Sequence, residues 1–390
     1  MAEEEERKGP LAGLKVIEMA GIGPVPLAAL ILSEMGATVL RVDRLKAGPS
    51  FLNLPPELDI DRHGRETLRV DLKAADGIAL MRDLAAGADV LIEGFRPGVM
   101  ERLSLGPDDL LAVNPGLVYG RMTGFGQDGP LAPRAGHDMT YLALTGMLHA
   151  IGPKDGRPVP PLNLVADYGG GTMFLIAGVL AALFERSRSG RGQVIDAAMI
   201  DGASTLGNLP FALLAAGLWR DRRGSNLLDS GAPFYDTYET ADGRHIAVAC
   251  LEPPFFTEFA RLLPLAERFA AAQYDVRLWP EMRAAIAARV AERSRDDWEA
   301  IFADTDACVA PVLSMTEAPD HPHNVARGTF RRAGGLVRAA PAPRFSRTPS
   351  SPAAPPSTAP GAGDRIAALD AFGISPSRSE ALAMSGVIGR

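Results

Sequence analysis

The sequence predicts an α/β protein with a large domain built on a parallel sheet and a smaller α+β domain after it. Short apolar runs alternate with helical segments of about ten residues over the first third of the chain, which indicates βαβ units. A charged break at Arg220–Gly224 then precedes a hairpin pattern and Ala- and Arg-rich helices. With 390 residues, 47% hydrophobic and 22% charged, the chain has ample material for two cores.

Six runs in the first 200 residues are expected to be strands. They follow one another through helices, so the strands should pair in parallel. The expected strands are Leu14–Met19, Thr38–Asp43, Thr67–Leu72, Asp89–Glu93, Leu117–Met122 and Gln193–Asp196. The expected helices are Leu27–Met35, Gly77–Leu84, Pro107–Val113 and the long apolar Thr172–Leu183.

The rest of the chain predicts a small domain and a returning tail. Thr237–Ala249 reads as a β-hairpin with an Asp242-Gly243 turn, and helices follow as far as Ala303. Pro341–Pro360 is typical of an extended, unpacked tether, and Asp364–Ala383 can form a short terminal helix. We therefore expect a large domain over 1–200 to which 331–390 returns, a linker helix over 201–229 and a small domain over 230–330.

Charge and cysteine content exclude several classes of protein. With 40 Lys and Arg against 47 Asp and Glu, the net charge of −7 argues against a nucleic-acid partner. Cys250 and Cys308 give neither a disulfide framework nor a metal motif, so we expect no metal site. The acidic start does not resemble a signal peptide, and the longest apolar run, Thr172–Phe184, is shorter than the roughly 20 residues of a membrane span. The sequence predicts a cytoplasmic protein with no membrane partner.

A glycine-rich turn follows the first expected strand. Gly21-Ile-Gly23-Pro-Val-Pro26, with an acid at Asp43, approximates a dinucleotide-binding fingerprint. Pro26 replaces the third glycine and removes a backbone N–H that a pyrophosphate would bind. Arg41 and Arg44 suit a terminal phosphate better than a free ribose. We favour a plain strand-to-helix turn over nicotinamide binding.

The densest polar stretches are Gly136–Tyr141 and Pro160–Gly171. His137 and Asp138 precede a helical run, where the free N–H groups of a helix start can hold an anion. Asp167 stands before three glycines and the long apolar helix. Helix capping by either aspartate, and an ordinary loop position for His137, remain alternatives for each residue taken singly.

Together with these two stretches, six further motifs follow one another along the chain: Gly9–Glu18, Ile92–Val99, Arg121–Pro130, Gly190–Met199, Gly231–Tyr238 and Ala340–Thr348. On these motifs, the chain from Gly9 to about Thr348 resembles the class III CoA-transferase superfamily. Within it the chain is most similar to the α-methylacyl-CoA racemases, especially the bacterial ones. The Pro-rich tail is the least similar part.

The resemblance implies a Rossmann-like large domain and an interlocked homodimer in which each chain threads through its partner. It implies an isomerase of fatty-acid and lipid metabolism that interconverts (2R)- and (2S)-2-methylacyl-CoA thioesters through an enolate. Coenzyme A would enter as part of the acyl-CoA substrate, and no separate cofactor would be needed. Arg44, Lys73 and Arg102 fall at positions that contact coenzyme A in the family.

On the same pattern, His137 and Asp167 are the acid and base on opposite faces of the substrate α-carbon. Asn163 and Glu252 match supporting polar residues, and Glu252 would reach His137 from the other subunit. The backbone N–H of Asp138 would face the thioester oxygen.

Two alternatives stay open. In the CoA-transferases of the superfamily, the aspartate at the position of Asp167 is a nucleophile that forms an anhydride and an aspartyl-CoA thioester. Asp167 therefore does not discriminate between the reactions, whereas His137 and Asn163 favour the racemase because transferases generally lack a histidine there. A noncatalytic acyl-CoA-binding protein is the third hypothesis.

Overall fold

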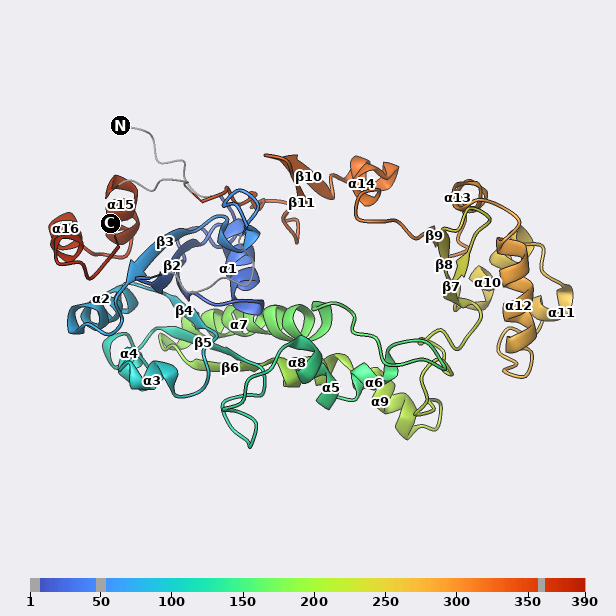
Figure 1. Cartoon of the computed structure of the whole chain (residues 1–390), viewed down its shortest axis with the longest axis horizontal. Coiled ribbons are helices and arrows are strands. Elements are labelled where there is room, and N and C mark those ends of the chain that lie inside the picture. Colours follow the sequence, from blue (N-terminus) through green and yellow to red (C-terminus); the bar gives the residue numbers. More distant parts are fainter. Residues whose placement is uncertain (1–7, 47–53, 357–361, 390) are drawn as a thin grey trace. The chain divides into compact units, whose positions relative to one another are not determined.

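The structure is a computed structural model that describes residues 8–46, 54–356 and 362–389. The chain forms two compact units (Figure 1). Unit 1 consists of Met1–Thr145, Leu162–Leu206 and Gly328–Arg390, and unit 2 of Gly146–Pro161 and Gly207–Arg327. The expected linker is thus divided between the units after residue 206. The acidic start, residues 1–7, and residues 357–361 of the Pro-rich segment lie outside the described residues.

Unit 1 is built on a six-stranded parallel sheet with the order β3-β2-β1-β4-β5-β6. This order is typical of α/β folds that bind ligands beyond the carboxyl ends of their strands. The prediction of a parallel sheet is confirmed. Its strands are β1 (Lys15–Met19), β2 (Thr38–Arg44), β3 (Glu66–Val70), β4 (Val90–Glu93), β5 (Val118–Thr123) and β6 (Val194–Ala198).

The helices of unit 1 are α1 (Pro24–Glu34), α2 (Ala75–Ala86), α3 (Val99–Arg102), α4 (Pro107–Val113), α5 (Asp138–Leu144), α7 (Met173–Ser189), α8 (Met199–Leu206), α15 (Ala362–Asp370) and α16 (Pro376–Met384). A 3₁₀ turn at Ile60–Arg62 and a π-helix at Leu164–Thr172 complete its helical elements among the described residues.

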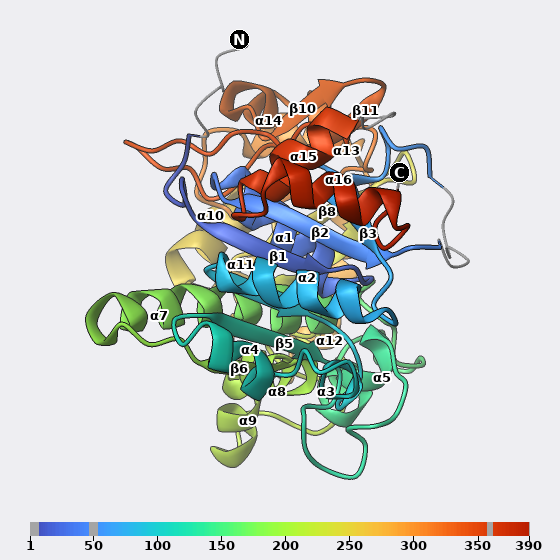
Figure 2. The same ribbon diagram turned by 90° about the vertical axis from the view of Figure 1, so that its left-hand side faces the viewer.

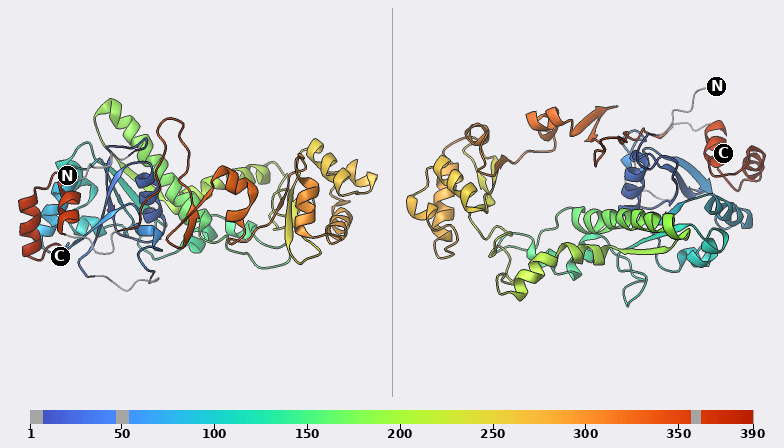
Figure 3. Two further views of the ribbon diagram at one scale, coloured as in Figure 1. Left: turned by 90° about the horizontal axis from the view of Figure 1, so that it is seen from above. Right: turned by 180° about the vertical axis from the view of Figure 1, so that it is seen from behind.

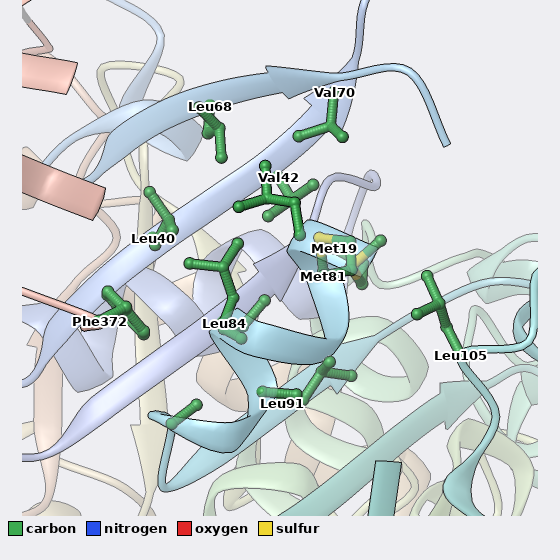
Figure 4. Close-up of a cluster of buried hydrophobic side chains, with 14 of the residues drawn as sticks. Met19, Leu40, Val42, Leu68, Val70, Met81, Leu84, Leu91, Leu105 and Phe372 are labelled. Carbon is green, nitrogen blue, oxygen red and sulfur yellow. The ribbon is translucent and has the colours of Figure 1, made fainter. Parts of the chain in front are cut away.

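Helices cover both faces of this sheet. α2, α15 and α16 lie over one face (Figure 2), and α1 and α7, which contact each other, lie over the other (Figure 3). The core beneath α2 joins Leu40, Val42 and Leu68 of the strands to Met81 of α2 and to Phe372 after α15 (Figure 4). Burial of these apolar side chains, alternating with residues of the opposite face, fixes the register of the sheet.

The Pro-rich segment packs along unit 1. The backbone N–H of Ser351 donates to Glu34 O at 2.9 Å, and the N–H of Gly64 donates to Ala354 O at 2.7 Å. Ala353 between them is buried. The expectation of an unpacked tether is therefore wrong for the described part of this segment, because its backbone groups bond to the large unit.

The end of the chain differs from the single terminal helix that we expected. It forms two helices, α15 and α16, separated at Gly373, whose φ of +85° lies in the left-handed region that ends helices. Leu369 and Leu382 from the two helices enter the core of unit 1. An antiparallel hairpin that the sequence did not predict, β10 (Phe330–Ala333) with β11 (Leu336–Ala339), precedes them.

Unit 2 contains a three-stranded antiparallel sheet of β7 (Tyr235–Glu239), β8 (His245–Ala249) and β9 (Val309–Pro311). The predicted hairpin and its turn are confirmed, with Gly243 at φ +71°. β9 was not predicted, because three residues carry too little pattern. Cys250 is buried in the aromatic core of this unit. Its helices are α6 (Met147–Ala150), α9 (Asn208–Ala215), α10 (Pro253–Leu262), α11 (Glu267–Ala270), α12 (Trp279–Val290), α13 (Arg295–Phe302) and α14 (Pro322–Arg327), with a 3₁₀ turn at Ala318–Asp320.

One helix among the described residues has the length and apolar composition of a membrane span. It is the continuous segment Leu164–Ser189, 26 residues formed by the π-helix and α7. This helix is longer than the apolar run Thr172–Phe184 of the sequence, in part because the π-helix extends α7 toward the N-terminus. A single helix of this kind is weak evidence for a membrane, since core helices share these properties.

Candidate active site

His137 stands at the start of α5, as the sequence predicted. It is the N-cap residue, with extended backbone, and its side chain is exposed. The hydroxyl of Thr140 accepts the backbone N–H of His137 at 2.9 Å and donates to His137 O at 2.7 Å. These two bonds fix the backbone of His137 at the first turn of the helix.

The carboxylate of Asp138 links α5 to the π-helix. Asp138 is buried, and its Oδ2 accepts the backbone N–H groups of Ala166 and Asp167, each at 2.8 Å. Its Oδ1 has no hydrogen-bond partner among the described residues. Because Asp138 follows His137 directly, this link ties the backbones of the two expected acid/base residues to each other.

Asp167 lies inside the π-helix rather than at a helix cap, so the capping alternative is wrong for this residue. The wide turns of π-helices occur frequently at functional sites. The glycines that follow Asp167 allow α8 to pack directly on the π-helix: a Cβ on Gly170 would lie 2.5 Å from the backbone N of Ala203. The glycine run therefore serves close packing beneath the carboxylate.

The environment of Asp167 favours its protonated form. Burial raises the pKa of Asp167 above its ordinary value; the hydrogen bond from Asn163 Nδ2 to Asp167 Oδ2, at 3.4 Å, lowers it, the nearby Asp138 carboxylate raises it, and His137 lowers it. The pKa remains raised on balance. His137, Asn163 and Asp138 thus all lie near enough to Asp167 to shift its pKa.

The glycine-rich turn, which we had interpreted as a plain connection, also belongs to this site. A Cβ on Gly23 would lie 3.4 Å from Asp167 Oδ2, and Gly23 has a φ of +74°. Thr172 Oγ1 of the π-helix donates to Pro24 O at 2.9 Å, which holds the turn against that helix. The turn follows the carboxyl end of β1, where ligands bind in folds of this kind, and this position could have indicated that the turn belongs to the site.

Tyr141 is a further residue of the site that the sequence analysis did not assign. Its ring occupies a slot between Gly124 and Gly136, where added Cβ atoms would lie 2.0 and 2.4 Å from the ring. Burial raises the pKa of Tyr141, and the carboxylates of Asp167 and Asp138 raise it further. The phenol therefore lies near the acidic pair and stays protonated at neutral pH.

The expected coenzyme A residues lie at or after the carboxyl ends of three strands of the sheet. Arg44 ends β2, Lys73 follows β3 and Arg102 ends α3, and all three side chains are exposed. Such cations are available to phosphates. Arg41 is not, because it is buried beside Asp43 at 3.5 Å and near Glu18; its earlier pairing with Arg44 as a phosphate ligand is wrong.

Glu252 lies in unit 2, between β8 and α10. It is the N-cap residue of α10, with an extended backbone (φ −74°, ψ 141°) and an exposed side chain. Its carboxylate raises the pKa of Tyr274 and of Cys308, in addition to the effect of burial on each. Glu252 therefore presents its carboxyl group on the surface of unit 2.

Fold and site together define an α/β protein with a parallel sheet and a histidine–aspartate pair in the same unit. The chain belongs to CoA-transferase family III, whose sequence pattern matches residues 11–365. The resemblance recognised in the sequence is thereby confirmed. Within the described residues, no group of three or more His, Cys, Asp or Glu side chains is placed to hold a metal ion.

Characterised relatives include racemases and transferases. The chain is 45% identical over 346 residues to "Alpha-methylacyl-CoA racemase" of Mus musculus and 43% identical over 345 residues to that of Homo sapiens, each covering 88% of both chains. It is 27% identical over 366 residues to "Succinyl-CoA:glutarate CoA-transferase" of Mus musculus, covering 89% of this chain and 83% of the relative.

Solved structures share the fold. A CAIB/BAIF family protein from Brucella suis matches with a TM-score of 0.77 and 27% identity, covering 93% of this chain and 99% of the other. Rv3272 from M. tuberculosis matches with a TM-score of 0.74 and 26% identity over the same shares.

Proposed function

We propose that this protein is an α-methylacyl-CoA racemase, an isomerase that interconverts (2R)- and (2S)-2-methylacyl-CoA thioesters. The observation that carries the proposal is the placement of His137 within electrostatic range of Asp167, with Asp138 joining their backbones. The identity of 43–45% to two racemases supports it.

The reaction moves one proton off the α-carbon and returns a proton from the opposite face. A C–H bond beside a thioester is a weak acid, so the step requires a base, a stabilised enolate and an acid. His137 and Asp167 exchange these roles according to the epimer bound, and each positioned acid or base contributes about 10²–10⁴ in rate. The raised pKa of Asp167 makes its carboxylate a stronger base than an ordinary aspartate.

Enolate stabilisation is assigned to the backbone N–H of Asp138. This group lies in the first turn of α5, where N–H groups lack intrahelical acceptors. One such donor to a developing oxyanion contributes on the order of 10²–10³ in rate. Asn163 holds Asp167, and Glu252 of the partner subunit would support His137.

Coenzyme A is bound in this proposal as part of the acyl-CoA substrate. Arg44, Lys73 and Arg102 offer exposed cations at the edge of the sheet, which its phosphates require in a chain of net charge −7. No separate cofactor or metal takes part, and the enzyme acts in the cytoplasm on fatty-acyl substrates.

An interlocked homodimer completes the proposal. After Asn208, α9 is apolar, yet none of its eight residues is buried, and Leu209, Phe211 and Leu214 are each more than 40% exposed. Apolar surface of this kind is usually covered by another protein. A second copy of this chain supplies that cover and brings Glu252 to His137. No membrane or nucleic acid is needed as a partner.

The test separates the racemase from the transferase of the same family. NMR in deuterium oxide should show solvent deuterium at Cα from either epimer of 2-methyldecanoyl-CoA, without an acceptor acid. With hydroxylamine present, the enzyme should stay active and the peptide mass at Asp167 unchanged. A transferase would form an acyl anhydride at Asp167 and lose activity as a hydroxamate formed. A hydroxamate at Asp167, or turnover that requires an added carboxylic acid, would replace the racemase by the transferase.

A further inference from the structure

Two side chains hold the backbone just before Glu252. β8 ends at Ala249 and α10 begins at Pro253, so the carbonyl groups of Cys250 and Leu251 lie between the two elements. Gln273 Nε2 donates to Cys250 O at 3.0 Å and to Leu251 O at 2.8 Å. The hydroxyl of Tyr274 donates to Leu251 O at 2.5 Å. Three hydrogen bonds from two side chains thus converge on two consecutive carbonyls.

The segment that supplies these donors is itself fixed. Gln273 is 6% exposed, and its backbone carbonyl accepts the indole N–H of Trp279 at 2.9 Å. The ring of Tyr274 packs edge-on against Phe234, with centroids 5.3 Å apart. Gln273 is thus buried, whereas Tyr274 is 51% exposed and is held by its ring contact. Side chains anchored in these ways lose little further conformational entropy when they hold a partner.

α10 holds the backbone carbonyl of Glu252, which accepts the N–H of Phe256 at 3.0 Å, but no bond within the helix holds its carboxylate. In this helix Glu252 is followed by Pro253 and Pro254, which have no N–H group, and its carboxylate makes no capping bond to the helix. Its direction is therefore set by the backbone conformation of the preceding residues. Tyr274 lies within electrostatic range of the Glu252 carboxylate, so the donors stand beside the group whose backbone they hold.

We propose that Gln273 and Tyr274 are positioning residues that fix the direction of Glu252 for its work beside His137. The inference rests on the proposed function, in which the partner's Glu252 supports His137. Removing either donor leaves Glu252 in place but lets its backbone rotate, so that the carboxylate samples directions other than the productive one.

The experiment is a double-mutant cycle on α-proton exchange with 2-methyldecanoyl-CoA. Tyr274→Phe removes one hydroxyl and should lower kcat about 3- to 10-fold, the effect of one hydrogen bond, with KM changed less than about twofold. Gln273→Met, which removes two bonds, should lower kcat further. In a Glu252→Ala background, Tyr274→Phe should change kcat by less than about twofold, because the group it positions is gone.

Tyr238→Phe is the matched control. The hydroxyl of Tyr238 also donates to a backbone carbonyl of unit 2, that of Pro233, but not to the segment before Glu252. Its loss should leave kcat within about twofold of wild type, and thermal unfolding should show that all variants are folded.

Three other outcomes would each overturn the inference. An equal fall in kcat for Tyr274→Phe with and without Glu252, or an equal fall for Tyr238→Phe, would mean a structural role only. If kcat falls for Glu252→Ala but not for Tyr274→Phe or Gln273→Met, the two residues have no positioning role. The proposed function then stands. Wild-type activity of Glu252→Ala would instead remove Glu252 from the proposed mechanism, and the positioning role with it.

Discussion

At the scale of single residues, Asp138 acts through both its backbone and its carboxylate. Its sequence position predicted a helix start with a free N–H, and that position is confirmed. The bonds from its carboxylate to the N–H groups of Ala166 and Asp167 could not be predicted, because they join segments 28 and 29 residues apart. For the same reason the closeness of Gly23 to Asp167 was missed, since only tertiary packing brings them together.

The first prediction concerns the two acid/base residues. His137→Ala and Asp167→Ala should each lower racemisation by about 10²–10⁴-fold, because the reaction needs a group on each face of the α-carbon. Each variant should retain exchange of the α-proton of one epimer more than of the other. NMR of deuterium incorporation from each pure epimer measures this. Wild-type turnover in both variants would refute the assignment of two bases.

The second prediction concerns the charge of Asp138. The Asp138 carboxylate raises the pKa of Asp167, so Asp138→Asn should lower that pKa, while the amide oxygen still accepts the two N–H groups. Asp167 then stays ionised to lower pH. For the epimer whose α-proton Asp167 removes, kcat/KM falls at low pH as Asp167 becomes protonated, and this acid limb of the pH profile should move to lower pH. The maximal rate should fall as well, because a carboxylate of lower pKa is a weaker base.

The pH profile of each variant, measured from either epimer, tests this sign. Asp201→Asn, at an exposed carboxylate of α8, is the control and should leave the acid limb unchanged. A shift of that limb to higher pH in Asp138→Asn would contradict the electrostatic account.

At the scale of elements, the strands were predictable and the π-helix was not. The strands β1, buried after its first residue, and β4, buried throughout, carry a strong apolar pattern of their own. The residues of the π-helix include three glycines, which have low helix propensity, and their conformation depends on α8 packing against them. A stretch held by a neighbour distant in sequence leaves no local signal.

The third prediction follows from that contact. A Cβ on Gly202 of α8 would lie 1.9 Å from Gly170 O of the π-helix, so Gly202→Ala should force the two helices apart. We expect a loss of about 1–3 kcal/mol in the free energy of unfolding. Because the displaced helix carries Asp167, kcat should fall as well.

Urea unfolding and α-proton exchange measure the two effects of Gly202→Ala. Gly116→Ala is the control, because its added Cβ would approach no atom closer than 3.4 Å. It should change the free energy of unfolding by less than about 1 kcal/mol. A Gly202→Ala protein of native stability and activity would show that the close approach of the two helices is not required.

At the scale of the whole molecule, the family resemblance implies a homodimer, but the residue pattern itself does not show which surface takes part. The apolar exposed surface of α9 became visible only when the helix could be seen to bury none of its residues. In sequence, the same run of Leu and Phe is indistinguishable from a core helix. The proposed homodimer therefore needs a test that reports which chain supplies each residue of a site.

The last prediction uses two inactive variants to answer that question. If each site combines His137 of one subunit with Glu252 of the other, dimers of His137→Ala alone and of Glu252→Ala alone should both be strongly impaired. In a mixed dimer, one site carries both substitutions, whereas the other receives His137 and Glu252 intact. Random assortment makes half the dimers mixed, each with one native site of two, so the mixture should regain about one quarter of wild-type activity.

Coexpression of differently tagged chains, isolation of the mixed dimer and α-proton exchange measure this recovery. A His137→Ala, Glu252→Ala double variant mixed with wild type calibrates it. If verified mixed dimers recover no activity above the parent variants, His137 and Glu252 act within one chain, and the shared site of the interlocked dimer is refuted.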